Sequence, residues 1–145
     1  MSTHQNIPLS DLQPPEEALL QLTGLIARLR SPQGCPWDRK QTPASFKRYL
    51  LEEAHELHES LDGDDLEHIC EELGDLLFQV LFIAEMYREQ GAFTLSEVIN
   101  GIIGKMVRRH PHVFGDRQVA SEDELRRQWE AIKETEKKDK GPLTT

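Results

Sequence analysis

Residues 71–86 read EELGDLLFQVLFIAEM, and this stretch determines the fold class that we predict. At about 100° per residue, the side chains of residues 73–87 make nearly the whole circumference of a helix apolar. A helix of this kind is buried, either in the centre of a helical bundle or in an interface between subunits. Glu72, Asp75 and Gln79 nevertheless form a narrow polar stripe on it. Packing alone does not account for that stripe.

The region before this stretch reads as two helices separated by a break. Apolar residues over 18–29 follow the i, i+3, i+4, i+7 spacing of a helix with one buried face. Residues 31–41, SPQGCPWDRKQ, interrupt that pattern with proline and glycine. Thr42 then supplies an N-cap and Pro43 a proline at the first helical position. These signals predict a second helix over about 43–61.

Three further helices follow from turn and capping signals. DGDD at 62–65 predicts a turn, after which the opening stretch lies on a third helix over about 66–89. TLSE at 94–97 has the spacing of a capping box and predicts the start of a fourth helix, which Pro111 ends. SEDE at 121–124 has the same spacing and predicts the start of a fifth.

These patterns predict an all-α protein, a helical bundle of about five helices with a central antiparallel helix hairpin. The second, third and fourth predicted helices should form the core of the bundle. We expect a single domain over 1–145, with its core at about 15–135. The first 12 or so residues and KKDKGPLTT at 137–145 should be loose tails.

Composition limits the possible partners and location of the chain. It has 145 residues and a net charge of −9, so its overall field does not attract nucleic acid. No apolar run reaches the ~18 residues that a membrane helix needs, and the N-terminus resembles no secretory signal. Cys35 and Cys70 lack a CxxC spacing and fit a reducing compartment. We therefore expect a cytoplasmic protein that binds neither nucleic acid nor membrane.

Carboxylates on the two central helices meet when the chain reverses direction at the DGDD turn and the helices pack as an antiparallel hairpin. Glu56 and Glu72 are each 8 residues from residue 64, and Glu53 and Asp75 are each 11 residues from it. Because a helix rises about 1.5 Å per residue, the members of each pair lie level across the hairpin. The sequence therefore predicts that four carboxylates, two from each helix, converge on one patch.

Such a patch is costly unless a cation binds to it. An unpaired buried carboxylate costs several kcal/mol, and mutual repulsion adds to that cost. All of the predicted ligands are hard oxygens, which suit Mg²⁺ or Mn²⁺ and do not suit a structural zinc ion. The ordinary alternative is that the four acids are solvated residues on exposed helix faces.

The same acids belong to a longer pattern, EExxE, fifteen residues and then ExxD, at 52–75. This pattern resembles the MazG-like nucleoside triphosphate pyrophosphohydrolases, an all-α family. Other segments are similar to MazG segments in the same order, so that the likeness covers about residues 15–135. These segments are GCPWDRKQT (34–42), LLFQVLFIAEM (76–86), KMVRRHPHVFGD (105–116) and WEAIK (129–133).

The resemblance implies an enzyme that hydrolyses nucleoside triphosphates, ribo or deoxy, to monophosphate and pyrophosphate in the upkeep of the nucleotide pool. It implies Mg²⁺ as cofactor, with Mn²⁺ as a substitute, and as metal ligands Glu53, Glu56, Glu72 and Asp75. These are the four residues that the hairpin register selects. Glu53 and Glu52 are the predicted catalytic residues. Glu52 would orient the attacking water, although the helical wheel places it on the polar side.

Basic and aromatic residues are candidates to bind the nucleotide. Three cations share one flank of the fourth predicted helix, where they suit phosphate, and the resemblance implies that two residues of the fifth approach the nucleotide. Each has a plainer alternative, a solvated basic helix end or a packed aromatic. The candidates are Tyr49, Lys105, Arg108, Arg109, Trp129 and Lys133.

Other functions and assemblies stay open. A ferritin-like di-iron protein would use Glu-x-x-His motifs, of which the chain offers one at 52–55 and an Asp-x-x-His at 65–68. A catalytically weak structural or regulatory MazG domain, as a fragment of a two-domain protein, is the other alternative. The apolar third helix predicts a homodimer or a higher homo-oligomer. No motif reports the base or sugar preference or the number of metals.

Overall fold

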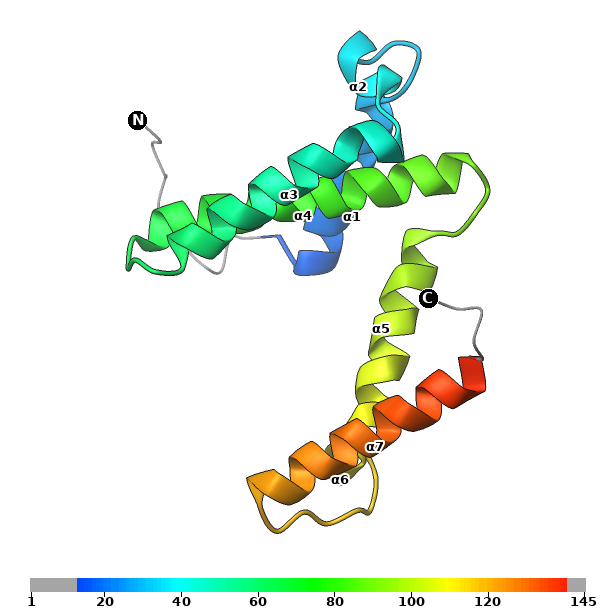
Figure 1. Cartoon of the computed structure of the whole chain (residues 1–145). Coiled ribbons are helices and arrows are strands. Elements are labelled where there is room, and N and C mark those ends of the chain that lie inside the picture. The colour runs from blue at the N-terminus through cyan, green and yellow to red at the C-terminus, as the bar shows by residue number, and fades with distance from the viewer. Residues whose placement is uncertain (1–12, 141–145) are drawn as a thin grey trace. The chain divides into compact units, whose positions relative to one another are not determined.

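The computed structural model describes residues 13–140, and these are helical without a strand (Figure 1). The all-α prediction is therefore confirmed. The described residues divide into two compact units, the N-terminal unit up to Leu95 and the C-terminal unit from Ser96 onward. The helices are α1 (Pro15–Leu29), α2 (Pro36–Lys40), α3 (Pro43–Ser60), α4 (Leu66–Glu89), α5 (Leu95–Arg109), α6 (Pro111–Phe114) and α7 (Glu122–Lys140).

Two of the seven helices in the described part are additions to the five that the sequence predicts. The short helices α2 and α6 each begin with a proline, which also sends the preceding chain into an extended or turn conformation. Helices of 5 and 4 residues are too short to show a hydrophobic period. At the C-terminus, residues 137–140 continue α7, whereas the sequence predicted a loose tail there. Residues 1–12 and 141–145 lie outside the described part.

The predicted ends of the central helices are confirmed by their caps. Ser45 N donates to Thr42 Oγ1 at 3.1 Å and Thr42 N donates to Ser45 Oγ at 2.9 Å, which closes a capping box at the start of α3. Asp65 Oδ1 accepts from His68 N at 3.2 Å and caps α4. Gly91, at φ 71°, follows the end of α4 in the left-handed conformation that glycine adopts without strain.

The core of the N-terminal unit lies where α1, α3 and α4 meet, with α3 running antiparallel along α4 (Figure 1). Phe46 of α3 stacks on Phe82 of α4 with ring centroids 4.3 Å apart. Burial of such a side chain contributes about 1.5–3 kcal/mol. The central hairpin is thus confirmed. The predicted core did not include α1, but α1 supplies the buried Ile26. The predicted core did include α5, but none of the described residues of α5 is buried.

Helix α4 is buried on one side only. A stripe of four apolar side chains along its first two thirds is exposed, at 76% for Leu66, 53% for Leu73, 47% for Leu77 and 43% for Val80. The prediction that this helix is buried all round therefore does not hold within a single chain. No helix within residues 13–140 combines the length and the apolar content that crossing a membrane requires.

Arg30 fixes the segment between α1 and α3. Its Nη1 donates to the carbonyl oxygens of Asp38 and Gln41 at 2.7 and 3.1 Å. Its Nε and Nη2 donate to the carboxylate of Glu89 at 2.7 and 3.0 Å. The loop also passes so close to α1 that a Cβ on Gly34 would lie 2.1 Å from a carbonyl oxygen, which only glycine tolerates. The segment that carries α2 is therefore held rigidly beside the hairpin.

Candidate functional site

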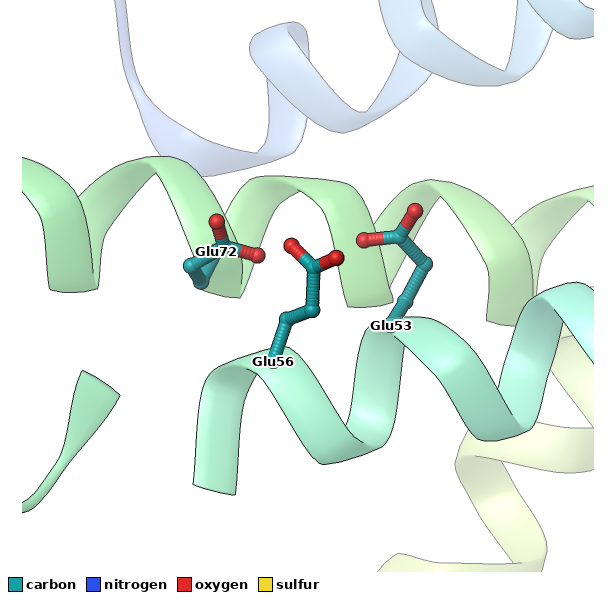
Figure 2. A group of neighbouring side chains, drawn as sticks. All are labelled: Glu53, Glu56 and Glu72. Carbon is teal, nitrogen blue, oxygen red and sulfur yellow. The ribbon is translucent and has the colours of Figure 1, made fainter. Parts of the chain in front are cut away.

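Three carboxylates meet between α3 and α4 (Figure 2). Glu53 and Glu56 lie one turn apart on α3 and point toward Glu72 of α4. One carboxylate oxygen from each residue lies within 4.8 Å of the others. The antiparallel register between the two helices brings these residues together, as the counting from the DGDD turn predicts. We refer to Glu53, Glu56 and Glu72 as the acidic cluster.

The surroundings of the acidic cluster disfavour the charged form of its carboxylates. Glu72 is only 5% exposed and Glu53 is half-buried. Burial raises the pKa of Glu53, and the neighbouring charges of Asp75, Glu56 and Glu72 raise it further. The pKa of Glu72 is raised by burial and then by Glu56 and Asp75, while His68 lowers it. The protein therefore stabilises protons, or other positive charge, at this position.

The cluster also holds oxygens that lack a partner. Glu53 Oε2 and Glu72 Oε2 are both buried without a hydrogen-bond donor, and Gln79 Oε1, on the same polar stripe of α4, is in the same state. Buried polar atoms are rarely left unpaired in a native protein. Because carboxylate and amide oxygens are the donors that hard cations prefer, these residues fit Mg²⁺ or Mn²⁺.

Two acids that the sequence places at the same site lie at its margin. Asp75 is exposed and stands outside the acidic cluster, although its charge raises the pKa of both Glu53 and Glu72. Glu52 is exposed as well, in agreement with its place on the polar side of the helical wheel, and it also raises the pKa of Glu53. The roles of Asp75 as a ligand and of Glu52 as a base stay predictions.

One residue beside the cluster, His68, was not predicted from the sequence. His68 Nδ1 lies 3.8 Å from Glu72 Oε1, one helical turn earlier on α4. The i, i+4 spacing of the two residues could have indicated this contact. A cavity of about 420 Å³ opens next to it, lined by His55, Glu56, Glu59, Ser60, Gly63, Asp65 and His68. A volume of this size is in the range of small-molecule pockets.

Tyr49 lies one turn before Glu53 on α3 and is half-buried against the core. The exposed Trp37 meets it edge-on, with ring centroids 5.6 Å apart, and the guanidinium of Arg48 lies 5.0 Å from its ring centroid. Tyr49 is thus packed and also next to accessible aromatic and cationic groups, so both of its predicted roles are compatible with this position.

In the C-terminal unit, two of the predicted nucleotide contacts, Arg109 and Lys133, lie beside Trp129. The Arg109 guanidinium carbon lies 5.9 Å and Lys133 Nζ lies 4.8 Å from the centroid of its indole ring. A cavity of about 490 Å³ adjoins the ring, lined by Arg109, His110, Glu122, Leu125, Arg126, Trp129 and Glu130. The indole ring offers a stacking surface for a flat group, and the cations beside it can bind an anion, while Glu122 and Glu130 place negative charge on the same lining.

The cations of α5 are placed unequally. Arg109 is largely buried, with 15% of its side chain exposed, whereas the side chain of Arg108 is 59% exposed. Lys105 is half-buried one turn earlier. Both arginines form ion pairs with Glu136 of α7, at 2.9 Å for Arg109 and 3.4 Å for Arg108. Neither Glu136 nor the cavity residue Arg126 was predicted from the sequence, because the tertiary arrangement of α5 and α7 decides which charges meet.

Comparisons with known proteins show the family of the chain. Residues 41–114 match the family model of the MazG nucleotide pyrophosphohydrolase domain. The chain is 50% identical over 117 residues to the nucleoside triphosphate pyrophosphohydrolase/pyrophosphatase MazG of Thermotoga maritima, covering 81% of the chain and 44% of that protein. It is 42% identical over 121 residues to the nucleoside triphosphate pyrophosphohydrolase of Escherichia coli, covering 83% of the chain and 46% of that protein.

Two further matches concern length and fold. The chain is 47% identical over 144 residues to the uncharacterized protein YabN of Bacillus subtilis, covering 92% of the chain and 29% of that protein. The crystal structure of a MazG-related protein from Thermotoga maritima matches with a TM-score of 0.66 and 27% identity, covering 79% of the chain and 98% of that structure. The chain thus spans less than half of the length of these three curated relatives.

Proposed function

The chain belongs to the MazG nucleotide pyrophosphohydrolase family, and from this premise we propose that it hydrolyses nucleoside triphosphates to nucleoside monophosphate and pyrophosphate. In this reaction a water molecule attacks the α-phosphorus, a P–O bond to it forms, and the bond to the bridging oxygen of the pyrophosphate breaks. The observation that carries the proposal is the acidic cluster, because two of its buried oxygens have no partner of their own.

We propose that Glu53, Glu56 and Glu72 hold Mg²⁺, with Asp75 completing the ligand set, and that Mn²⁺ can replace it. Bound there, the cation would neutralise phosphate charge and lower the pKa of a bound water. The protein's own part is to fix the ligand geometry through the rigid packing of α3 on α4. Glu52 and Glu53 would orient the attacking water and accept its proton.

The substrate would be bound by cationic and aromatic groups. Lys105, Arg108 and Arg109 suit phosphate oxygens, because lysine offers a point charge and arginine a fork of donors. Trp129 with Lys133, and Tyr49 in the N-terminal unit, suit the flat base or the sugar-phosphate next to it. Each of these assignments is proposed from the chemical properties of the side chain.

The exposed apolar stripe of α4 supports a homodimer or a higher homo-oligomer. Leu66, Leu73, Leu77 and Val80 expose large apolar side chains in one row, which a second copy of the chain would cover. We further propose that the protein acts in the cytoplasm on free nucleotides, since the net charge of −9 disfavours nucleic acid as a partner.

A catalytically weak MazG domain within a longer protein is the second candidate. It is favoured by the short span of this chain within its curated relatives, which is 29–46% of their length for the three compared above. In such a protein this domain would have the acidic cluster, but a second MazG domain would catalyse the reaction. The presence of Glu53, Glu56, Glu72 and Asp75 in the sequence of α3 and α4 favours the active domain.

Pyrophosphate release separates the two candidates. The purified chain is incubated with each canonical ribo- and deoxynucleoside triphosphate, with Mg²⁺ and with EDTA, and pyrophosphate and monophosphate are quantified. We expect equal amounts of both products with Mg²⁺ and none with EDTA. The proposed activity would be rejected if no nucleotide released pyrophosphate, or if the products were inorganic phosphate and nucleoside diphosphate.

A further inference from the structure

Glu136 occupies an unusual place among the acids of α7. Its Oε2 accepts from Arg109 Nη2 at 2.9 Å and from Arg109 Nε at 3.3 Å, and its Oε1 lies 3.4 Å from Arg108 Nη2. Only 16% of its side chain is exposed. These hydrogen bonds hold the pKa of Glu136 below its usual range, so the carboxylate is charged at neutral pH.

Arg109 contacts two different groups. Glu136 binds its Nε and Nη2, yet Glu136 is absent from the lining of the cavity beside Trp129. Arg109 does line that cavity, and its guanidinium carbon lies 5.9 Å from the centroid of the indole ring. The carboxylate therefore holds the guanidinium from outside the cavity, while the cation itself remains next to the space that a ligand would enter.

Glu136 compensates only part of the positive charge of the two arginines that it contacts. Arg108 and Arg109 carry two positive charges and Glu136 carries one negative charge, so the three together keep a charge of +1. Lys133 Nζ lies 4.8 Å from the centroid of the same indole ring and is paired with Glu130 Oε1 at 3.9 Å. The cavity lining itself carries Arg109 and Arg126 together with Glu122 and Glu130. Glu136 thus restricts the freedom of Arg109 without cancelling its charge, and a guanidinium already held in place loses less conformational entropy when an anion binds.

We propose that Glu136 is a positioning residue that holds Arg109 against Trp129, ready to bind the polyphosphate of a nucleotide at this cavity. The choice of ligand rests on the proposed function. The competing explanation is that Glu136 only ties α7 to α5 and that its contact with Arg109 has no bearing on a ligand. The two explanations differ in whether the effect of Glu136 on binding depends on Arg109.

A double-mutant cycle measures that dependence. Parent, Glu136→Ala, Arg109→Ala and the double variant are titrated by calorimetry with α,β-methylene-ATP and Mg²⁺, a probe that the proposed reaction does not cleave. We expect Glu136→Ala to weaken binding about tenfold in the parent and less than about twofold in the Arg109→Ala background. Inorganic tripolyphosphate serves as a second probe without a base and should show the same coupling.

Matched variants separate positioning from folding. Glu136→Asp keeps the charge and should recover most of the affinity that Glu136→Ala loses. Glu134→Ala removes the same charge from an exposed position of the same helix and should leave the affinity unchanged. Thermal denaturation of each variant reports on folding, and Glu136→Gln, which keeps an acceptor oxygen, replaces the alanine variant in the cycle if that variant unfolds.

Two results would overturn the inference. One is an equal loss of affinity on removing Glu136 with and without Arg109, and the other is no loss at all in the parent. A parent that releases no pyrophosphate from any nucleotide but shows the expected coupling would refute the proposed function and leave the positioning role of Glu136 intact. A parent that binds neither probe would refute the positioning role.

Discussion

Glu72 in the N-terminal unit and Glu136 in the C-terminal unit are both largely buried glutamates on helices, yet their surroundings are opposite. Glu72 faces the carboxylates Glu53 and Glu56. Glu136 faces the guanidinium groups of Arg108 and Arg109. Accordingly the pKa of Glu72 is raised and that of Glu136 is lowered.

The difference shows which buried carboxylate requires an outside partner. The chain itself provides the counter-charge for Glu136, so that this residue stabilises the fold as it stands. For the acidic cluster the chain provides more negative charge, and only an added cation or proton can relieve the repulsion. A site of the second kind lowers stability in exchange for function, as is typical of active sites.

The largest expected effect tests the functional half of this comparison. Glu72→Gln keeps the size of the side chain but removes the charge that a hard cation would bind. Pyrophosphate release should fall on the order of 100-fold or more. Glu71→Gln, an exposed neighbour with the same change of charge, is the control and should retain its activity. Comparable turnover in both variants would mean that Glu72 is not a metal ligand.

Metal addition should relieve the repulsion that Glu72 experiences. At a Mg²⁺ concentration about 100-fold above the dissociation constant, binding adds about 2.7 kcal/mol to the free energy of unfolding. For a chain of this size the Tm should rise by roughly 5–11 °C. Differential scanning fluorimetry with Mg²⁺, Mn²⁺ and EDTA measures the shift, and Zn²⁺ should be a poor substitute. A flat response to saturating Mg²⁺, also with nucleotide present, would contradict the metal site.

The two glutamates should respond with opposite signs to the same substitution. In EDTA, Glu72→Gln should raise the Tm by a few degrees, because it removes one of several like charges. Glu136→Gln should lower the Tm by a similar amount, because it leaves the largely buried Arg109 without its carboxylate. Two denaturation curves against the parent decide this. If the Tm changes in the same direction in both variants, Glu72 and Glu136 do not have opposite effects on stability.

Asp75→Asn should repeat the behaviour of Glu72→Gln more weakly. Asp75 is exposed, so water already screens part of its repulsion with the acidic cluster. We expect a smaller stabilisation in EDTA than for Glu72→Gln, together with a clear loss of activity and of the Mg²⁺-dependent shift. A variant with full turnover and the full shift would remove Asp75 from the ligand set.

The pH dependence of stability should be the smallest effect. A raised pKa means that Glu53 and Glu72 contribute stability below the ordinary value of 4.5 and lose it as the pH rises through their folded-state pKa. Glu136, with a lowered pKa, contributes above 4.5 and loses its contribution as the pH falls through its folded-state pKa. In EDTA, the advantage of Glu72→Gln over the parent should therefore grow between about pH 4 and 7. Urea titrations at several pH values measure it, and an advantage independent of pH would contradict the raised pKa.

The features that could be predicted from the sequence are local or follow from counting. The cap at Thr42 and the meeting of Glu56 with Glu72 both depend on residues close to one short turn, where the helical rise fixes the geometry. The partner of Glu136 could not be predicted, because it depends on the side of α7 that faces α5. The place of Ile26 in the core likewise depends on how α1 crosses the hairpin, which no period within α1 reports.

The short connection at 61–65 has a consequence for how the chain folds. Glu53 and Glu72 are only nineteen positions apart, so they meet as soon as the hairpin closes, through one short loop with a small entropic cost. The repulsion in the acidic cluster therefore already opposes the earliest long-range contact of the N-terminal unit. Because α3 and α4 are adjacent in the chain, we expect their pairing to belong to the folding nucleus, so that a cation bound there would accelerate folding.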